Sequence, residues 1–432
     1  MSLKGYFFIA CFFIFSAGSL LFPHLGIYGY LADYCINPAD QWYGRPFARM
    51  GFRFSFTLAV ATLIGIILQR KKLKFGEALL YRQEWYLLFF LLALWLTHFI
   101  SPETVGRYGA TDHPTVKFTK IVIFTLMMTH VITDYKKLSG LFWVLAGAAT
   151  ILGMKAYSIP FGAFSRGRLE GIGGADFAEA NFFAAFMAAM LPIIAIQFLR
   201  SPWYGKIICL VSGAFTVNAV ILCRSRGAFV GLVAGAIISC IFAPQKHRKK
   251  IVLLLIVGMI GVVSVTDQTF IDRILTISVD QTEMDESAGS RFRLWEAGTQ
   301  MFINNPLGIG PGNWYQNIGS YIPEYEGKDS HSTYVKCLAE TGILGFSLFA
   351  WLVWLSYSNL RRTYKDAVAI GKDELDDFMH FYFAITVSCV ILFTCALTIT
   401  MIYTEILWLL LMLPVCLRRA FDNYLADTKL SL

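Results

Sequence analysis

The sequence predicts an all-α protein, a polytopic membrane bundle of about twelve transmembrane helices with one long, partly helical loop on the outer side. Of the 432 residues, 56% are hydrophobic and 16% are aromatic, whereas only 15% are charged. A soluble domain cannot bury that much apolar surface. The apolar residues also gather in runs of about 17–22, which suffice for a helix to cross roughly 30 Å of hydrocarbon.

The apolar runs divide the chain into four segments. Residues 1–266 are expected to hold nine transmembrane helices, 267–332 the outer loop, 333–417 three more helices, and 418–432 a cytoplasmic tail. The first run follows one early lysine and has no small-residue cleavage site, so we interpret it as a retained span. The expected spans lie near residues 5–22, 54–69, 85–100, 117–133, 139–156, 180–199, 207–223, 227–243, 251–266, 333–358, 380–397 and 401–417.

Basic residues predict the orientation of the chain, because lysine and arginine concentrate in the cytoplasmic loops of membrane proteins. With the N-terminus inside, more than half of the basic residues fall on the cytoplasmic side. Three clusters, Arg70–Lys74, Lys246–Lys250 and Arg361–Arg362, lie directly at span ends, where this bias matters most. Both termini are therefore expected in the cytoplasm, and the loop 267–332 is expected to face outward.

Arginine rather than lysine dominates the basic residues left on the outer side. Because arginine can bind phosphate through two parallel hydrogen bonds, this bias suggests a phosphate ligand, with lipid headgroups as the alternative partner. Arg166 and Arg168 lie in a glycine-rich loop before Asn181, where the next span opens. Glycines let the backbone approach a ligand, and a following helix N-terminus favours an anion. An ordinary flexible loop is the other interpretation.

A second pair of arginines, Arg224 and Arg226, interrupts two apolar runs at the outer membrane boundary. Charge beside a span is costly and usually functional. Gly227, Gly231 and Gly235 follow at four-residue spacing, which gives the next helix a smooth stripe that another helix can approach closely. A simple hairpin turn with arginines reaching out to water explains this segment equally well.

The outer loop itself contains an amphipathic segment, 290–301, and a histidine. Arg291 and Trp295 are four residues apart and share a helix face, while Arg293 points elsewhere. One arginine is expected to face a pocket and the other to face headgroups, and the sequence does not decide which. His331 stands just before the chain re-enters the membrane, where it is either a general acid or base or a neighbour of a helix cap.

Several arginines and one histidine at an outer membrane surface fit chemistry on a lipid-linked phosphate or diphosphate. The arginines would stabilise the charge of the leaving diphosphate, and His331 would activate an incoming hydroxyl. The sequence has no nucleotide-binding loop and no metal-ligand cysteine spacing, so no cofactor, metal or nucleic-acid partner is expected. A metal cluster at Glu283–Glu286 is the competing interpretation, although charge runs in loops are usually solvated.

Taken together, these motifs resemble the O-antigen ligase and polymerase superfamily of bacterial membrane glycosyltransferases. The resemblance covers roughly residues 160–417, and Arg168 to Asn181 is similar to the preceding outer loop of that family. The matching motifs are Ser225-Arg226-Gly227-Ala228, Arg291-Phe-Arg-Leu-Trp295 with Asn305-Pro-Leu-Gly308-Ile-Gly310 behind it, and His331-Ser-Thr-Tyr334 running into Ala339-Glu-Thr-Gly342-Ile-Leu-Gly345.

The resemblance implies a metal-independent, inverting transfer of a glycan from undecaprenyl diphosphate to a hydroxyl of lipid A-core, another glycan or a protein. The implied setting is the periplasmic face of the bacterial inner membrane. By position, Arg226 and one of Arg291 and Arg293 match the family's diphosphate-binding arginines, and His331 matches its acceptor-activating histidine. The family usually has Asn after that histidine, where this chain has Ser332, which can still cap a helix.

A flippase or transporter of lipid-linked oligosaccharide is the alternative from another class. It would share the span count and the basic outer surface, but the sequence lacks the paired intramembrane carboxylates and broken helices typical of transporters. Glu405 is the one acidic residue placed deep in the late spans, and we expect it to support the site as the partner of an outer arginine.

Overall fold

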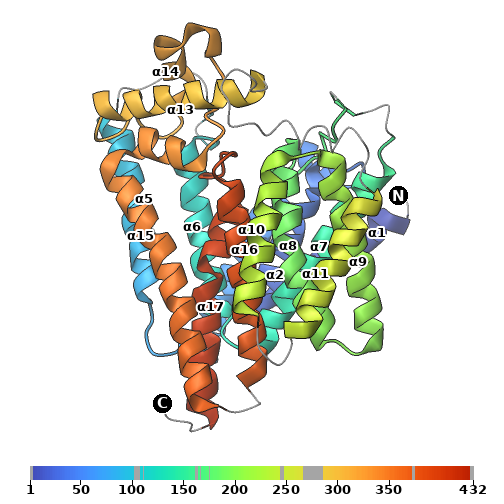
Figure 1. Cartoon of the computed structure of the whole chain (residues 1–432). Helices are drawn as coiled ribbons and strands as arrows, with labels where there is room; N and C mark the ends of the chain where they lie inside the picture. The colour runs from blue at the N-terminus through green and yellow to red at the C-terminus, as the bar shows by residue number, and fades with distance from the viewer. Residues whose placement is uncertain are drawn as a thin grey trace.

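Helices make up the regular structure of this protein. The computed structural model describes residues 3–101, 108–109, 111–160, 164–165, 167–174, 176–243, 248–265, 286–371 and 375–428. Within these ranges the chain forms helices and one isolated β-bridge, between Ser165 and Arg168. Figure 1 shows the long helices side by side, with α13 (Glu286–Asn304) and α14 (Trp314–Tyr321) across one end. The predicted all-α bundle is confirmed.

Each of the twelve predicted spans corresponds to a helix. Among the described residues, six helices are long and apolar enough to cross a membrane by length and composition: α5, α7, α8, α9, α15 and α16. The long helices are α1 (Leu3–Leu21), α2 (Pro23–Ile36), α4 (Phe54–Leu68), α5 (Arg82–Ile100), α6 (Pro114–Val131), α7 (Tyr135–Ser158), α8 (Ala180–Arg200), α9 (Trp203–Cys223), α10 (Arg226–Phe242), α11 (Arg248–Val265), α15 (Thr333–Ile370), α16 (Asp376–Cys395) and α17 (Glu405–Thr428). The short elements are η1 (Pro38–Asp40), α3 (Arg45–Arg49) and η4 (Pro323–Tyr325).

The two ends of the bundle differ in what they carry. We call the end covered by α13 and α14 the loop end. The opposite end carries the basic segments Arg70–Lys74, Lys136–Lys137 and Arg418–Arg419, and we call it the basic end. The last helix, α17, connects them, since it begins at Glu405 near the loop end and finishes at the basic end.

Helix α2 is missing from the predicted spans. It has only 14 residues, and His24 and Asp33 interrupt its apolar run, so the hydropathy pattern does not reveal it. It runs antiparallel to α4. Gly26, near the start of α2, packs on Thr62 in the last half of α4, whereas Asp33 accepts a hydrogen bond from Ser55 at the beginning of α4.

The additional helix reverses the expected side of the N-terminus. Helix α1 runs parallel to α4, because Phe8 lies against Phe54 at one end, with ring centroids 5.4 Å apart, and Gln69 bonds the Leu20 carbonyl at the other. After α4, Lys74 binds Asp427 near the C-terminus, so α1, α4 and α17 all finish at the basic end. The start of α1 and the end of α17 therefore lie at opposite ends of the described bundle, whereas the sequence predicted that both termini share one side.

The predicted tail 418–432 is also different in the structure. Helix α17 continues to Thr428, and the side chains of Arg418 and Arg419 are only 1% and 0% exposed. Adjacent basic residues normally indicate the end of a span, but here buried carboxylates neutralise them. Arg419 binds Glu84, and Arg418 binds Asp366 and Asp422. The helix can therefore continue without a solvated break.

A break in α15 docks the glycine-rich part of the outer loop. Gly342 has φ +62°, a backbone conformation that favours glycine, so the helix is interrupted there. Carbonyl groups freed by the break accept bonds from the loop: Ile309 N–H donates to Ala339 at 3.0 Å and Gly310 N–H to Glu340 at 3.0 Å. This contact joins two of the sequence motifs and fixes the segment that follows α13.

Candidate active site at the loop end

Arginines from three distant parts of the sequence line one small cavity at the loop end. The cavity has a volume of about 20 Å³, enough for roughly one water molecule. A larger anion can bind only if the arginine side chains move apart, or if it lies at the opening of the cavity. The lining residues are Arg168, Asn181, Arg224, Arg226, Gly227, Arg291 and Thr398.

Hydrogen bonds fasten the glycine-rich loop to the turn between α9 and α10. Arg168 donates from Nε to the Cys223 carbonyl at 3.1 Å and from Nη2 to Asn181 Oδ1 at 2.6 Å. Arg224, whose φ is +47°, donates to the Gly167 carbonyl at 2.7 Å. These bonds orient the two guanidinium groups and fix the loop against the turn.

Arg226 begins α10 and is held by the packing of that helix. Ser225 caps the helix by accepting from Ala228 N–H at 3.4 Å, and its hydroxyl donates to Asn181 at 3.0 Å. The cap places the positive end of the helix dipole beside the cavity, which favours an anion.

The glycine stripe of α10 faces α16 and the loop after it. A Cβ atom on Gly227 would lie 2.3 Å from Thr398 Oγ1, and one on Gly231 would lie 2.7 Å from Cys395 Sγ. Any larger residue would push the helices apart. The prediction that this stripe lets another helix approach closely is confirmed.

The structure decides between the two arginines of α13. Arg291 lines the cavity. Arg293 points to the opposite side, where its side chain is 52% exposed, pairs with Glu324 at 3.3 Å and lies over the Tyr325 ring at 4.9 Å. The Trp295 indole donates to the Ser330 carbonyl at 3.1 Å. The face of α13 that carries Trp295 and Arg291 is therefore bonded to the segment that contains His331.

His331 occupies an unusual backbone position between well-anchored neighbours. Its φ is +49°, which is uncommon for a residue other than glycine. Ser330 bonds the Thr400 hydroxyl at 3.0 Å, and Thr333 donates to the Ile399 carbonyl at 2.6 Å. Ser332 caps α15 by accepting from Val335 N–H at 3.4 Å, which confirms the prediction that it can cap a helix. Bonds on both sides therefore maintain the strained conformation and fix the direction of the imidazole.

The surroundings of His331 favour its neutral form. Burial lowers the pKa of the imidazole, Asp329 raises it, and the cations Arg291, Lys336 and Lys328 lower it further. The net shift is downward from the ordinary value. Within the described part of the chain the imidazole has no hydrogen-bond partner, so it can accept a proton from a bound hydroxyl.

An ion pair that the sequence did not reveal supports this segment. Lys336 binds Asp329 at 2.8 Å, and its ammonium lies 4.1 Å from the centre of the Tyr315 ring. Burial raises the pKa of the Asp329 carboxyl, but Lys336, a hydrogen bond with Thr400 and the nearby His331 together lower it more, and the net pKa is lowered. Thr398, which lines the arginine cavity, was also not predicted. The sequence gives no signal for the Lys336–Asp329 pair or for Thr398, because each depends on which loops meet at this end.

Glu405 does not take the predicted role. Its Oε1 accepts a hydrogen bond from the Tyr30 hydroxyl at 3.0 Å. Its charged neighbours are Asp176, Lys117 and Asp33. Tyr30 belongs to the unpredicted helix α2. The expectation that Glu405 pairs with an outer arginine is therefore not met.

Two expectations concern residues outside the described ranges. Arg166 and Glu283–Asp285 lie there, as does the side chain of Glu286. Among the residues that are described, no group of three or more histidine, cysteine or acidic side chains can hold a metal ion. In the cavity lining, the positive charge comes from Arg168, Arg224, Arg226 and Arg291.

The fold and site define a polytopic helical membrane protein with a cationic, histidine-bearing site at one end of its bundle. Residues 209–350 match the model of the O-antigen ligase family, and this segment contains Arg226, Arg291 and His331. The match confirms the resemblance to the O-antigen ligase and polymerase superfamily and supports a membrane glycosyltransferase function of ligase or polymerase type. No curated protein matches the chain.

Proposed function

We propose that this protein transfers a glycan from undecaprenyl diphosphate to an acceptor hydroxyl at the loop end of the bundle. The observation that carries the proposal is that one cavity is lined by four arginines, Arg168, Arg224, Arg226 and Arg291. His331 is close enough to Arg291 for the arginine charge to lower the pKa of the imidazole. The family match supports a lipid-linked glycan and an acceptor as the substrates.

The arginines would bind the diphosphate of the donor. Guanidinium groups match phosphate geometry, and the N-terminus of α10 adds a positive dipole. As the bond between the sugar carbon and the diphosphate oxygen breaks, negative charge grows on the departing diphosphate, and fixed cations stabilise it. Arg226 is the most firmly positioned of these arginines, because the close packing of Gly227 and Gly231 against Thr398 and Cys395 fixes α10. In this mechanism the guanidinium groups neutralise the diphosphate and no metal takes part.

His331 would activate the acceptor. Its neutral imidazole takes the proton of the acceptor hydroxyl while the oxygen attacks the sugar carbon from the side opposite the leaving diphosphate. One carbon–oxygen bond forms as the other breaks, so the sugar configuration inverts. Asp329 is near enough to stabilise the imidazolium that results.

The distribution of basic residues sets the side of the membrane in this proposal. The basic end belongs in the cytoplasm, and the loop end then faces the periplasm of a bacterial inner membrane. With α2 counted as a crossing, the N-terminus is periplasmic and the C-terminus cytoplasmic. We propose lipid A-core as the acceptor, with a growing glycan or a protein hydroxyl as the alternatives within the same chemistry.

The test uses purified protein in liposomes with a labelled polyprenyl-diphosphate glycan and each acceptor in turn. Mass spectrometry of the product identifies the acceptor. Arg226→Lys should abolish most transfer, because lysine keeps the charge but loses the two-bond geometry. Arg293→Lys, on the other side of α13, should retain it. Movement of the donor across the bilayer without any product would contradict the proposal and indicate a flippase.

A further inference from the structure

A second, larger cavity lies at the basic end of the bundle, remote from the arginine site. Its volume is about 380 Å³, and its walls come from the segment after α4, the start of α7 and the last turns of α17. Four lysines line it: Lys72, Lys74, Lys136 and Lys137. The proposed transfer reaction uses none of them.

The walls of this cavity are joined by one buried side chain. Asn423 of α17 donates to the Thr133 carbonyl at 2.9 Å and to the Lys74 carbonyl at 3.3 Å, and it accepts from Gly76 N–H at 3.1 Å. One amide therefore connects all three elements. The cavity is a built feature of the fold and does not depend on the chance position of surface loops.

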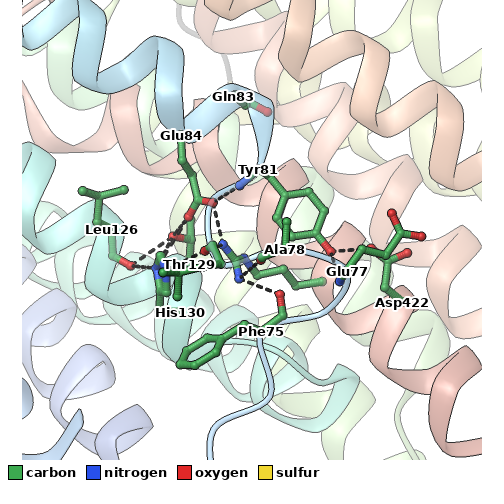
Figure 2. A network of polar contacts seen from close by, with 12 residues as sticks. Phe75, Glu77, Ala78, Tyr81, Gln83, Glu84, Leu126, Thr129, His130 and Asp422 are labelled. Atoms are coloured by element: carbon green, nitrogen blue, oxygen red, sulfur yellow. Dashed lines mark hydrogen bonds and ion pairs between the residues drawn. The ribbon is translucent and has the colours of Figure 1, made fainter. Parts of the chain in front are cut away.

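A buried polar network behind the cavity holds the same segments in place (Figure 2). Arg419 binds Glu84 and donates to the carbonyls of Phe75, Ala78 and Leu79. Tyr81 in turn donates to Asp422. The network fixes the chain between α4 and α5 against α17, which keeps the wall that carries Lys72 and Lys74 in one position.

The cavity has an excess of positive charge. Lys74 pairs with Asp427 at 2.7 Å and Lys137 with Asp134 at 2.8 Å. Lys72 and Lys136 have no carboxylate partner within the described part of the chain, and both are exposed. The 24-residue helix α7 also begins here, and the Asp134 carboxylate caps it by accepting from Lys137 N–H at 2.8 Å.

We propose that this cavity binds the phosphate group of an acidic phospholipid of the adjoining leaflet. Lys72 and Lys136 would contact the phosphate, and Tyr135 and Tyr424 in the lining offer an aromatic rim of the kind that suits a headgroup interface. The cavity lies at the basic end, which in the proposed orientation meets the cytoplasmic leaflet, whose acidic lipids attract basic residues. A soluble phosphate compound has the same charged group, so the experiment must separate these two sources.

The experiment follows the melting temperature of the full chain, purified in detergent, as lipid is added. Dioleoylphosphatidylglycerol should raise it, and dioleoylphosphatidylcholine at the same concentration should not. Lys72→Gln/Lys136→Gln should raise the half-saturating concentration of phosphatidylglycerol about 30-fold, which corresponds to roughly 1 kcal/mol for each lysine. Because both side chains are exposed, this variant should melt like the wild type when no lipid is added.

A matched control is Lys249→Gln/Lys250→Gln. These exposed lysines begin α11 and do not line the cavity, so their loss should leave the phosphatidylglycerol response unchanged. Equal weakening in both double variants, or no response to phosphatidylglycerol in the wild type, would overturn the site. Inorganic phosphate acting as strongly as phosphatidylglycerol would overturn the phospholipid assignment in favour of a soluble phosphate compound.

Discussion

Arginines cluster at both the loop end and the basic end, but the two clusters differ in burial and in hydrogen-bond partners. At the basic end, Arg418 and Arg419 are fully buried and bind carboxylates, among them Glu84 and Asp422. At the loop end, Arg168 and Arg224 are partly exposed, and the bonds described above run to carbonyl and amide oxygens.

The difference separates arginines that are buried inside the bundle from arginines that line a cavity. A buried arginine needs an internal anion, because an unpaired buried charge costs several kcal/mol. The arginines of the loop end line a cavity, where a ligand can reach them. Loss of an arginine should therefore reduce stability at the basic end and reduce function at the loop end, and four experiments test this contrast.

The largest expected effect is on catalysis at the loop end. His331→Gln should lower the transfer rate by about 10²–10⁴-fold, since general-base catalysis contributes about that much. The measurement is the rate of product formation in liposomes at saturating donor. The melting temperature should stay close to that of the wild type, and a normal rate would contradict the role of His331 as a base.

A comparable effect on stability is expected at the basic end. Arg419→Met leaves Glu84 buried without its partner and should lower the free energy of unfolding by about 3–5 kcal/mol. Thermal unfolding in detergent measures this change, and adding Glu84→Gln should recover part of the loss. Arg362→Ala removes an exposed ion pair at 3.8 Å and should cost less than about 1 kcal/mol. Equal losses in both arginine variants would remove the contrast.

The two arginines of α13 allow the contrast to be tested within one helix. Arg291→Ala should lower transfer by about 10²–10³-fold, as loss of one group that stabilises developing charge typically does. Arg293→Ala removes an exposed pair with Glu324 and should change transfer by less than about twofold. The measurement is kcat/KM for the donor, and the reverse ranking would show that α13 presents its other face to the substrate.

The smallest expected effects are on the pH dependence of transfer. Neutral His331 is the active form, so transfer should fall as pH drops through a pKa that burial holds below the ordinary value near 6.5. Asp329 raises that pKa, so Asp329→Asn should move the acid limb of the kcat/KM profile to lower pH. Lys328 lowers it, so Lys328→Gln should move the limb slightly upward. Shifts of the same sign in both variants would exclude His331 as the titrating group.

Much of the site could be predicted from the sequence because its chemistry is concentrated in a few residue types. Arginine at an outer boundary, a glycine stripe and a histidine before a span are local patterns, and they indicated Arg226, His331 and the pair Arg291 and Arg293 as candidates. The partner of Glu405 was missed for a physical reason. Tyr30 lies on α2, whose 14 residues and interior Asp33 leave no continuous apolar run for the hydropathy pattern to detect.

The sequence by itself determined the membrane setting, the predicted helices, the glycine contact of α10 and the residue types of the site, because each follows from composition or from spacing along one helix. Only the tertiary structure decided that Arg291 rather than Arg293 lines the cavity and that Asp329 and Lys336 support His331. It also decided that α1 begins and α17 ends at opposite ends of the described bundle. These features depend on which distant segments meet, and burial and charge pairing across the whole bundle select those contacts.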